Sequence, residues 1–154
     1  MYNVLMFLHF LSSAIFLGTG FGIAFFLARA TATRSSTRAA HIAGSVLSME
    51  LFLTMPSVVI LAITGSILAG MKGHSFVEGW LLLSLVVFVM VVVLCVPVVL
   101  AQVQMRNLAE DTRDARKPLS QDFLKYHRIS LLCGVPAFLG ALLIMWVMVL
   151  KPAI

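Results

Sequence analysis

Four long apolar segments, at residues 4–28, 51–69, 80–101 and 129–150, take up most of this chain. A helix of about 20 apolar residues is enough to cross the hydrocarbon core of a bilayer. Charged residues make up only 11% of the sequence, whereas a typical soluble domain carries about 25%. The sequence therefore predicts an all-α bundle of four transmembrane helices, which forms a single membrane domain within the lipid bilayer.

The basic residues are distributed unevenly between the gaps that separate these segments. Nine of the eleven Lys and Arg lie in the gaps at 29–48 and 102–128, and the other two are Lys72 and Lys151. By the positive-inside rule these two gaps are cytoplasmic, so both termini lie on the outer side. We expect a multi-pass protein of a bacterial inner membrane. Because cations beside membrane segments meet anionic lipid, the net charge of +5 does not indicate nucleic acid as a partner.

The gap at 102–128 alternates acidic and basic residues, among them Glu110, Asp111 and Arg113. Such alternation is typical of a solvated helix with local ion pairs. We therefore expect the third apolar segment to continue as a helix beyond the membrane. Pro118 should end that helix, and Ser120 should cap the next one.

Residues that weaken helices fall at a similar depth in every segment. Pro56, Pro97 and Pro136 lie within about two turns of the cytoplasmic ends of their segments, at ~1.5 Å of rise per residue, and Gly18 and Gly22 lie near this depth in the first. Each proline removes a backbone hydrogen bond. One interpretation is tolerated kinks with a small-residue packing face, since the two glycines form a G-x-x-x-G pair. The other is a vestibule, open to the cytoplasm, in which the helices splay around a ligand.

His9 lies about two turns into the first segment from its outer end. An ionisable residue at such depth is a functional hypothesis by default; the alternative is a neutral histidine bonded to a carbonyl or hydroxyl of a neighbouring helix. Met6 shares its helical face, and Met145 and Met148 lie at a comparable outer depth. His and Met form one axial pair for haem iron, and imidazole with thioethers also suits Cu(I). Methionine is equally an ordinary filler of apolar interfaces.

Further polar residues lie toward the ends of the segments. His74 and Glu78 fall in the short outer gap, close enough in depth to the histidine of the first segment to join a site there. Glu50 stands just before the second segment, and we expect it to be solvated or paired with His127 or Arg128. The sequence contains no phosphate loop, no G-x-S-x-G and no C-x-x-C motif, so it indicates no particular enzymatic activity.

Several stretches of the chain resemble one known family. The resemblance rests on Leu8-His9, Phe16-Leu17-Gly18-Thr19-Gly20-Phe21-Gly22, Phe52-Leu53-Thr54-Met55-Pro56, Pro97-Val98-Val99 and Gly134-Val135-Pro136-Ala137-Phe138. In this order they are similar to the predicted integral membrane proteins grouped as domain of unknown function 2269. The resemblance covers nearly the whole chain. It implies a four-span membrane fold and no particular activity, because the family has none established.

The same stretches are distantly similar to two further groups, the copper-resistance D type of membrane protein and the four-helix, haem-binding protoporphyrinogen oxidases. Both groups carry a first-span Leu-His followed by an aromatic-x-Gly pattern, here Leu8-His9 and Phe16-Leu17-Gly18. The resemblance implies His9 as a candidate haem ligand. The chain departs from the oxidases because its third segment contains no Lys or Arg, so cofactor binding is implied rather than oxidase activity.

Three functional hypotheses follow. The first is a protein that binds haem b or takes part in redox chemistry, with His9 as one ligand and Met145, Met148 or His74 on the other face. The second is copper handling by His9, Met6 and Met145, with Met148 as a further soft ligand. The third is a structural subunit or assembly factor without a cofactor, which packs against a membrane-protein partner or against further copies of the same chain.

Overall fold

The structure of the protein is a computed structural model that describes residues 1–32, 36–73, 78–114 and 121–150. The helical elements within these residues are α1 (Tyr2–Ala32), α2 (Ser36–Met49), η1 (Glu50–Thr54), α3 (Met55–Met71), α4 (Gly79–Asp114) and α5 (Gln121–Leu150). They supply four helical segments that are long and apolar enough to cross a membrane. The structure thus confirms the predicted all-α bundle of four spans.

The second span is one continuous helical segment made of α2, η1 and α3. Within it, η1 is a π-helical turn, in which the backbone N–H of Met55 bonds to the carbonyl of Glu50 five residues earlier. This turn ends two residues before Pro56, which has no N–H to donate. A π-helical turn changes the direction in which nearby side chains point, and here Glu50 and Thr54 are both buried. Glu50 therefore lies inside a helical span rather than ahead of one.

The charged gap after the third apolar segment is helical, as predicted, because α4 continues to Asp114. In this extension Arg106 bonds to Glu110, with 3.0 Å between Nε and Oε1. Asp122 lies in the first turn of α5, where a carboxylate interacts favourably with the helix dipole. The expected helix end at Pro118 and the expected cap at Ser120 lie outside the described residues.

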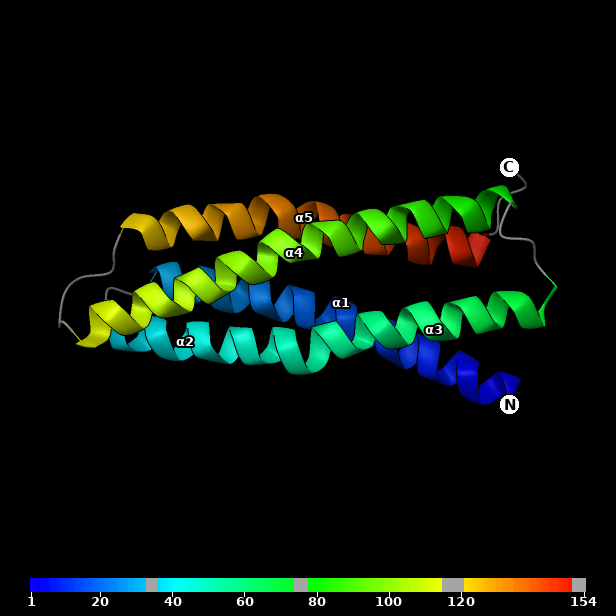
Figure 1. Cartoon of the computed structure of the whole chain (residues 1–154), viewed down its shortest axis with the longest axis horizontal. Coiled ribbons are helices and arrows are strands. Elements are labelled where there is room, and N and C mark those ends of the chain that lie inside the picture. The colour runs from blue at the N-terminus through cyan, green and yellow to red at the C-terminus, as the bar shows by residue number, and fades with distance from the viewer. Residues whose placement is uncertain (33–35, 74–77, 115–120, 151–154) are drawn as a thin grey trace.

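The helices run side by side along the long axis of the molecule (Figure 1). We call the end at which α1 and α4 finish and α2 and α5 begin the basic end, because Arg29, Arg106, Lys125 and Arg128 lie near it. There α1, α2, α4 and α5 meet around one buried cluster. The cluster contains Ile23, Leu27, Ala30, Ala39, Ala40, Ala43, Val46, Met105, Ala109 and Phe123.

The other half of the bundle is organised as two helix pairs. There α4 packs along α5 and α1 packs along α3, whereas α3 makes little contact with α4 or α5, and the two pairs lie apart in Figure 1. The start of α1 and the finish of α5 both lie at this opposite end. The first residues of α1 and the last residues of α5 therefore share one end of the bundle, and the assignment of the termini to the outer side of the membrane stays a prediction.

The closest helix contact at a glycine lies between α4 and α5. A Cβ atom on Gly140 would lie 2.8 Å from Cγ2 of Val91, whereas a Cβ on Gly18 would meet nothing within 4 Å and one on Gly22 would lie 3.4 Å from the Met49 side chain. Small residues let membrane helices approach closely. The glycine on which tight packing depends is therefore Gly140, rather than the first glycine of the G-x-x-x-G pair.

Candidate functional site

A cavity of about 180 Å³ lies between α1, η1, α4 and α5. It sits next to the buried cluster, since Ile23 and Leu27 belong to both. Most of its wall is apolar and includes Phe16 of α1, Val98 of α4 and Phe138 of α5. An apolar cavity of this kind within a helical bundle is a common setting for ligand sites.

The mouth of the cavity lies between α1 and α5. Phe21, Val135 and Leu139 line it and remain 69%, 51% and 57% exposed, on a surface that lipid covers in a membrane. The cavity occurs at the depth of Gly134, near Pro136 within α5, where the vestibule interpretation placed an open space. The vestibule was expected to open to the cytoplasm, whereas the exposed part of this cavity's lining lies on the sides of α1 and α5, which lipid would cover in a membrane.

A buried carboxyl group forms the polar part of the cavity wall. Glu50 is 3% exposed and Gln102 is 1% exposed. Nε2 of Gln102 donates a hydrogen bond to Oε2 of Glu50 over 3.3 Å, whereas Oε1 of Gln102 is buried without a partner. The prediction that Glu50 is solvated or paired with His127 or Arg128 is wrong, because α4 supplies its partner and the core surrounds it. Among the described residues, none donates to its second carboxyl oxygen.

Hydroxyl groups extend this polar wall. Thr54 donates to Oγ1 of Thr19 over 3.1 Å, and Thr19 in turn donates to the carbonyl of Ile15 over 2.8 Å. Ser130 lines the cavity and is buried, yet its hydroxyl makes no hydrogen bond within the described part of the chain. The cavity therefore presents the free oxygen of Glu50, the lone pairs of Thr54 and an unbonded hydroxyl. A molecule that donates hydrogen bonds fits this set.

Sequence reasoning missed this constellation because it located the membrane segments by their apolar runs. Glu50 directly precedes one run and was placed near the inner interface, whereas Gln102 directly follows another run and was placed in the cytoplasmic gap. The available signal was Pro56. A proline removes a backbone hydrogen bond from the turn before it, and here that turn is π-helical and begins at the buried Glu50.

His9 contacts α3 near the opposite end of the bundle. Its Nδ1 lies 2.9 Å from Oγ1 of Thr64, and the Thr64 hydroxyl donates to the carbonyl of Ile60 over 2.6 Å. Since that hydroxyl has only one hydrogen, Nδ1 of His9 is the donor to Thr64. The ring of His9 also lies close to Gly65, because a Cβ atom on Gly65 would be 3.3 Å from Cε1 of His9. This is the contact with a neighbouring hydroxyl that the alternative interpretation of His9 predicted.

The methionines that were candidate ligands lie on α1 and α5. Met6 of α1 and Met145 of α5 are exposed, and Met148 of α5 is partly buried. Near His9 the neighbour of α1 is α3, whereas α5 runs beside α4 (Figure 1). His74 lies outside the described residues. Within the described ranges no three His, Cys, Asp or Glu residues are grouped as a metal site, and the haem and copper hypotheses stay predictions.

Comparisons with known proteins identify the family. No curated protein and no solved structure matches this chain significantly, and the distant similarity to the copper-resistance D type and to the oxidases stays a prediction. The family model described as a predicted integral membrane protein, domain of unknown function 2269, matches residues 3–152. The match spans all four helical spans of the structure. The chain therefore belongs to the domain-of-unknown-function 2269 family of predicted integral membrane proteins.

Proposed function

We propose that this membrane protein binds amphiphilic amines, which enter its cavity from the bilayer and place their ammonium group against Glu50. One observation carries the proposal. A carboxyl group that is 3% exposed borders a cavity whose mouth opens toward lipid, and one of its oxygens accepts no hydrogen bond from the described residues. Ionisable residues inside membrane segments commonly mark ligand and ion sites.

The chemistry of the polar wall selects the head group of the ligand. A buried carboxylate is costly unless a countercharge pairs with it, and Gln102 is a neutral partner. An ammonium group supplies one positive charge and three donors, which match the free oxygen of Glu50 and the acceptors on Thr54 and Ser130. An alcohol would bond to the hydroxyls but would leave a carboxylate unpaired.

The shape of the cavity sets the size of the part that it holds. An apolar cavity of about 150 Å³ takes a molecule the size of benzene, so the 180 Å³ here suits the head group and the first part of a chain. The remainder of an alkyl chain would leave between Phe21 and Leu139, both of which face lipid. The site therefore suits a single-chain amphiphile rather than a water-soluble amine.

Binding of tritiated dodecylamine to the protein in lipid nanodiscs tests the proposal, with empty nanodiscs as background. Glu50→Gln replaces the carboxyl by an amide and removes the countercharge of the ammonium group. Because hydrogen bonds to charged groups contribute about 1.5–3 kcal/mol, we expect the affinity for dodecylamine to fall roughly tenfold to a hundredfold. Glu110→Gln, on the exposed extension of α4, is the matched control and should bind normally. Melting temperatures verify that both variants fold.

Two results would overturn the amine assignment. One is dodecylamine binding that is equal in the wild type and in Glu50→Gln. The other is dodecanol that binds as tightly as the amine and is unaffected by the substitution, which would mean that the cavity recognises only an apolar chain.

A second proposal, binding of haem b or copper at His9, is supported by the bond to Thr64. Donation from Nδ1 leaves Nε2 of the neutral ring with its lone pair, and metal-ligating histidines characteristically donate their other N–H to a fixed acceptor. Visible spectra of the oxidised and reduced protein test this.

A Soret band that is lost in His9→Ala supports haem, and a colourless protein that binds one equivalent of Cu(I) through His9 supports copper. If neither appears and a membrane protein co-purifies, a structural subunit is favoured instead.

A further inference from the structure

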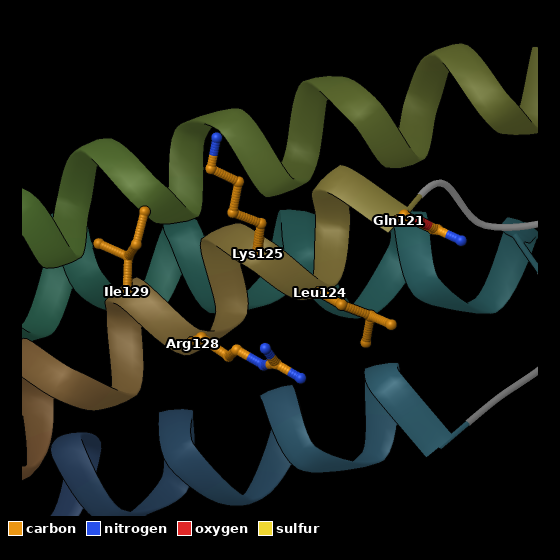
Figure 2. Close-up of a pocket in the computed structure, with 5 residues that line it drawn as sticks. All are labelled: Gln121, Leu124, Lys125, Arg128 and Ile129. Carbon is orange, nitrogen blue, oxygen red and sulfur yellow. The ribbon is translucent and has the colours of Figure 1, made fainter.

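A groove of about 440 Å³ lies at the basic end, along the first turns of α5. It is lined by Gln121, Leu124, Lys125, Arg128 and Ile129. In Figure 2 Lys125 and Arg128 lie one turn apart, with the Lys125 side chain directed toward α4 and the Arg128 side chain toward α1. Two long basic side chains thus border one hollow at the point where the apolar part of α5 begins.

Within the described part of the chain, neither positive charge of this groove has an acidic partner. Lys125 and Arg128 are both exposed, and neither forms an ion pair with any described residue. By contrast, Arg106 at the same end of the bundle pairs with Glu110 over 3.0 Å. Uncompensated cations beside a membrane segment attract anionic groups, so the groove is complementary to an anion.

An apolar strip continues from this groove along α5. Arg128, Leu131, Val135 and Leu139 follow one another at spacings of three and four residues, which places them on one face of the helix. Leu131, Val135 and Leu139 are exposed, and they also line the mouth of the cavity between α1 and α5. Positive charge at one end of an exposed apolar strip matches the layout of a phospholipid, with its phosphate at the interface and its chain along the helix.

We propose that the groove binds an acidic phospholipid of the adjacent leaflet, with the phosphate in the groove that Lys125 and Arg128 line and one acyl chain along Leu131, Val135 and Leu139. The bound chain lies across the mouth of the cavity. The inference does not depend on the amine site, because no acidic or hydroxyl group of the cavity takes part in it.

Native mass spectrometry of the purified protein, titrated with phosphatidylglycerol or with phosphatidylcholine of the same chains, tests the inference. The wild type should retain one phosphatidylglycerol in preference to phosphatidylcholine. Loss of a basic residue near the surface should lower the affinity about fivefold, and loss of both in K125Q/R128Q about thirtyfold, while phosphatidylcholine binding is unchanged. Both residues are exposed, so this double variant should melt at the wild-type temperature.

Matched variants separate a built site from general attraction. R106Q removes a cation that is already paired at the same end and should change phosphatidylglycerol binding little; a decrease as large as that of K125Q/R128Q would overturn the inference. Val135→Ser should weaken the binding of long-chain phosphatidylglycerol but not the binding of short-chain phosphatidylglycerol. Glycerol phosphate that competes as well as the lipid would contradict the role of the acyl chain. E50Q should leave lipid binding intact, which keeps this result separate from the amine proposal.

Discussion

The two halves of the bundle differ in how their helices are held together. At the basic end four helices enclose a cluster in which Ala30, Ala39, Met105 and Phe123 are fully buried. In the opposite half the helices form two pairs, and large residues such as Phe7 face outward. Lipid is as apolar as leucine, so membrane helices associate through close packing rather than through the hydrophobic effect. We infer that the basic end stabilises the fold, whereas the boundary between the halves accommodates the cavity.

The largest expected effect is the loss of packing at the basic end. Phe123→Ala should lower the free energy of unfolding by about 3–5 kcal/mol, because it removes a fully buried aromatic side chain and leaves a void. Phe7→Ala, on the lipid-facing side of α1, should change it by less than about 0.5 kcal/mol. Unfolding in mixed micelles of mild detergent and dodecyl sulfate measures both. Equal effects would mean that the two halves do not differ in packing.

The next effect concerns the α4–α5 pair. Gly140→Ala brings a methyl group to within 2.8 Å of Val91, and overpacking of this kind costs about 1–3 kcal/mol. Gly18→Ala, which meets nothing within 4 Å, is the control and should be neutral or slightly stabilising. The same unfolding measurement compares them. If Gly18→Ala is the more harmful change, the close approach of the helices lies on α1 instead.

The buried polar contact between the halves is expected to contribute less. Gln102→Leu removes the only donor that the described residues offer to the Glu50 carboxyl, and an unsatisfied buried group costs about 1–3 kcal/mol. We place the cost toward the lower end because the hydrogen bond is long, at 3.3 Å. Gln104→Leu, two residues along α4 and exposed, is the control. A Gln102→Leu protein as stable as the control would show that this hydrogen bond contributes nothing.

The smallest effect is expected in the α1–α3 pair. Thr64→Val removes the acceptor for Nδ1 of His9, and hydrogen bonds between membrane helices contribute about 0.6 kcal/mol on average. Ser66→Ala on the same helix removes only a bond to its own backbone and serves as the control. In a haem-loaded protein, a Thr64→Val change that also shifts the Soret band would favour His9 as a ligand.

Much of the fold could be predicted from the sequence because it follows from the solvent. Apolar segments of sufficient length must be helical in lipid, and on this basis the four spans were predicted. The alternation of acidic and basic residues predicted that the third span continues as a helix, as α4 does to Asp114. Which helices are neighbours could not be predicted in this way. Pairing depends on the shape of small residues such as Gly140 and Gly65 against particular side chains, and that shape leaves no periodic signal in the sequence.

The candidate site was only partly predictable. His9 was recognised because a titratable residue inside an apolar run is conspicuous, and its partner on a neighbouring helix was anticipated as a carbonyl or a hydroxyl. Because each borders an apolar run, Glu50 was placed near the interface and Gln102 in the cytoplasmic gap. Their meeting depends on the π-helical turn at η1 and on the packing of that turn against α4, and both are properties of the three-dimensional structure.

Carbodiimide modification of the protein in proteoliposomes tests the central claim most directly, namely that the carboxyl of Glu50 is reached from the bilayer. Lipid-soluble dicyclohexylcarbodiimide should modify Glu50, dodecylamine should protect it, and a water-soluble carbodiimide should modify the exposed Glu110 but not Glu50, as peptide mass spectrometry would show. Modification of Glu50 by the water-soluble reagent alone would contradict the account, because the carboxyl would then face water rather than a cavity open to lipid.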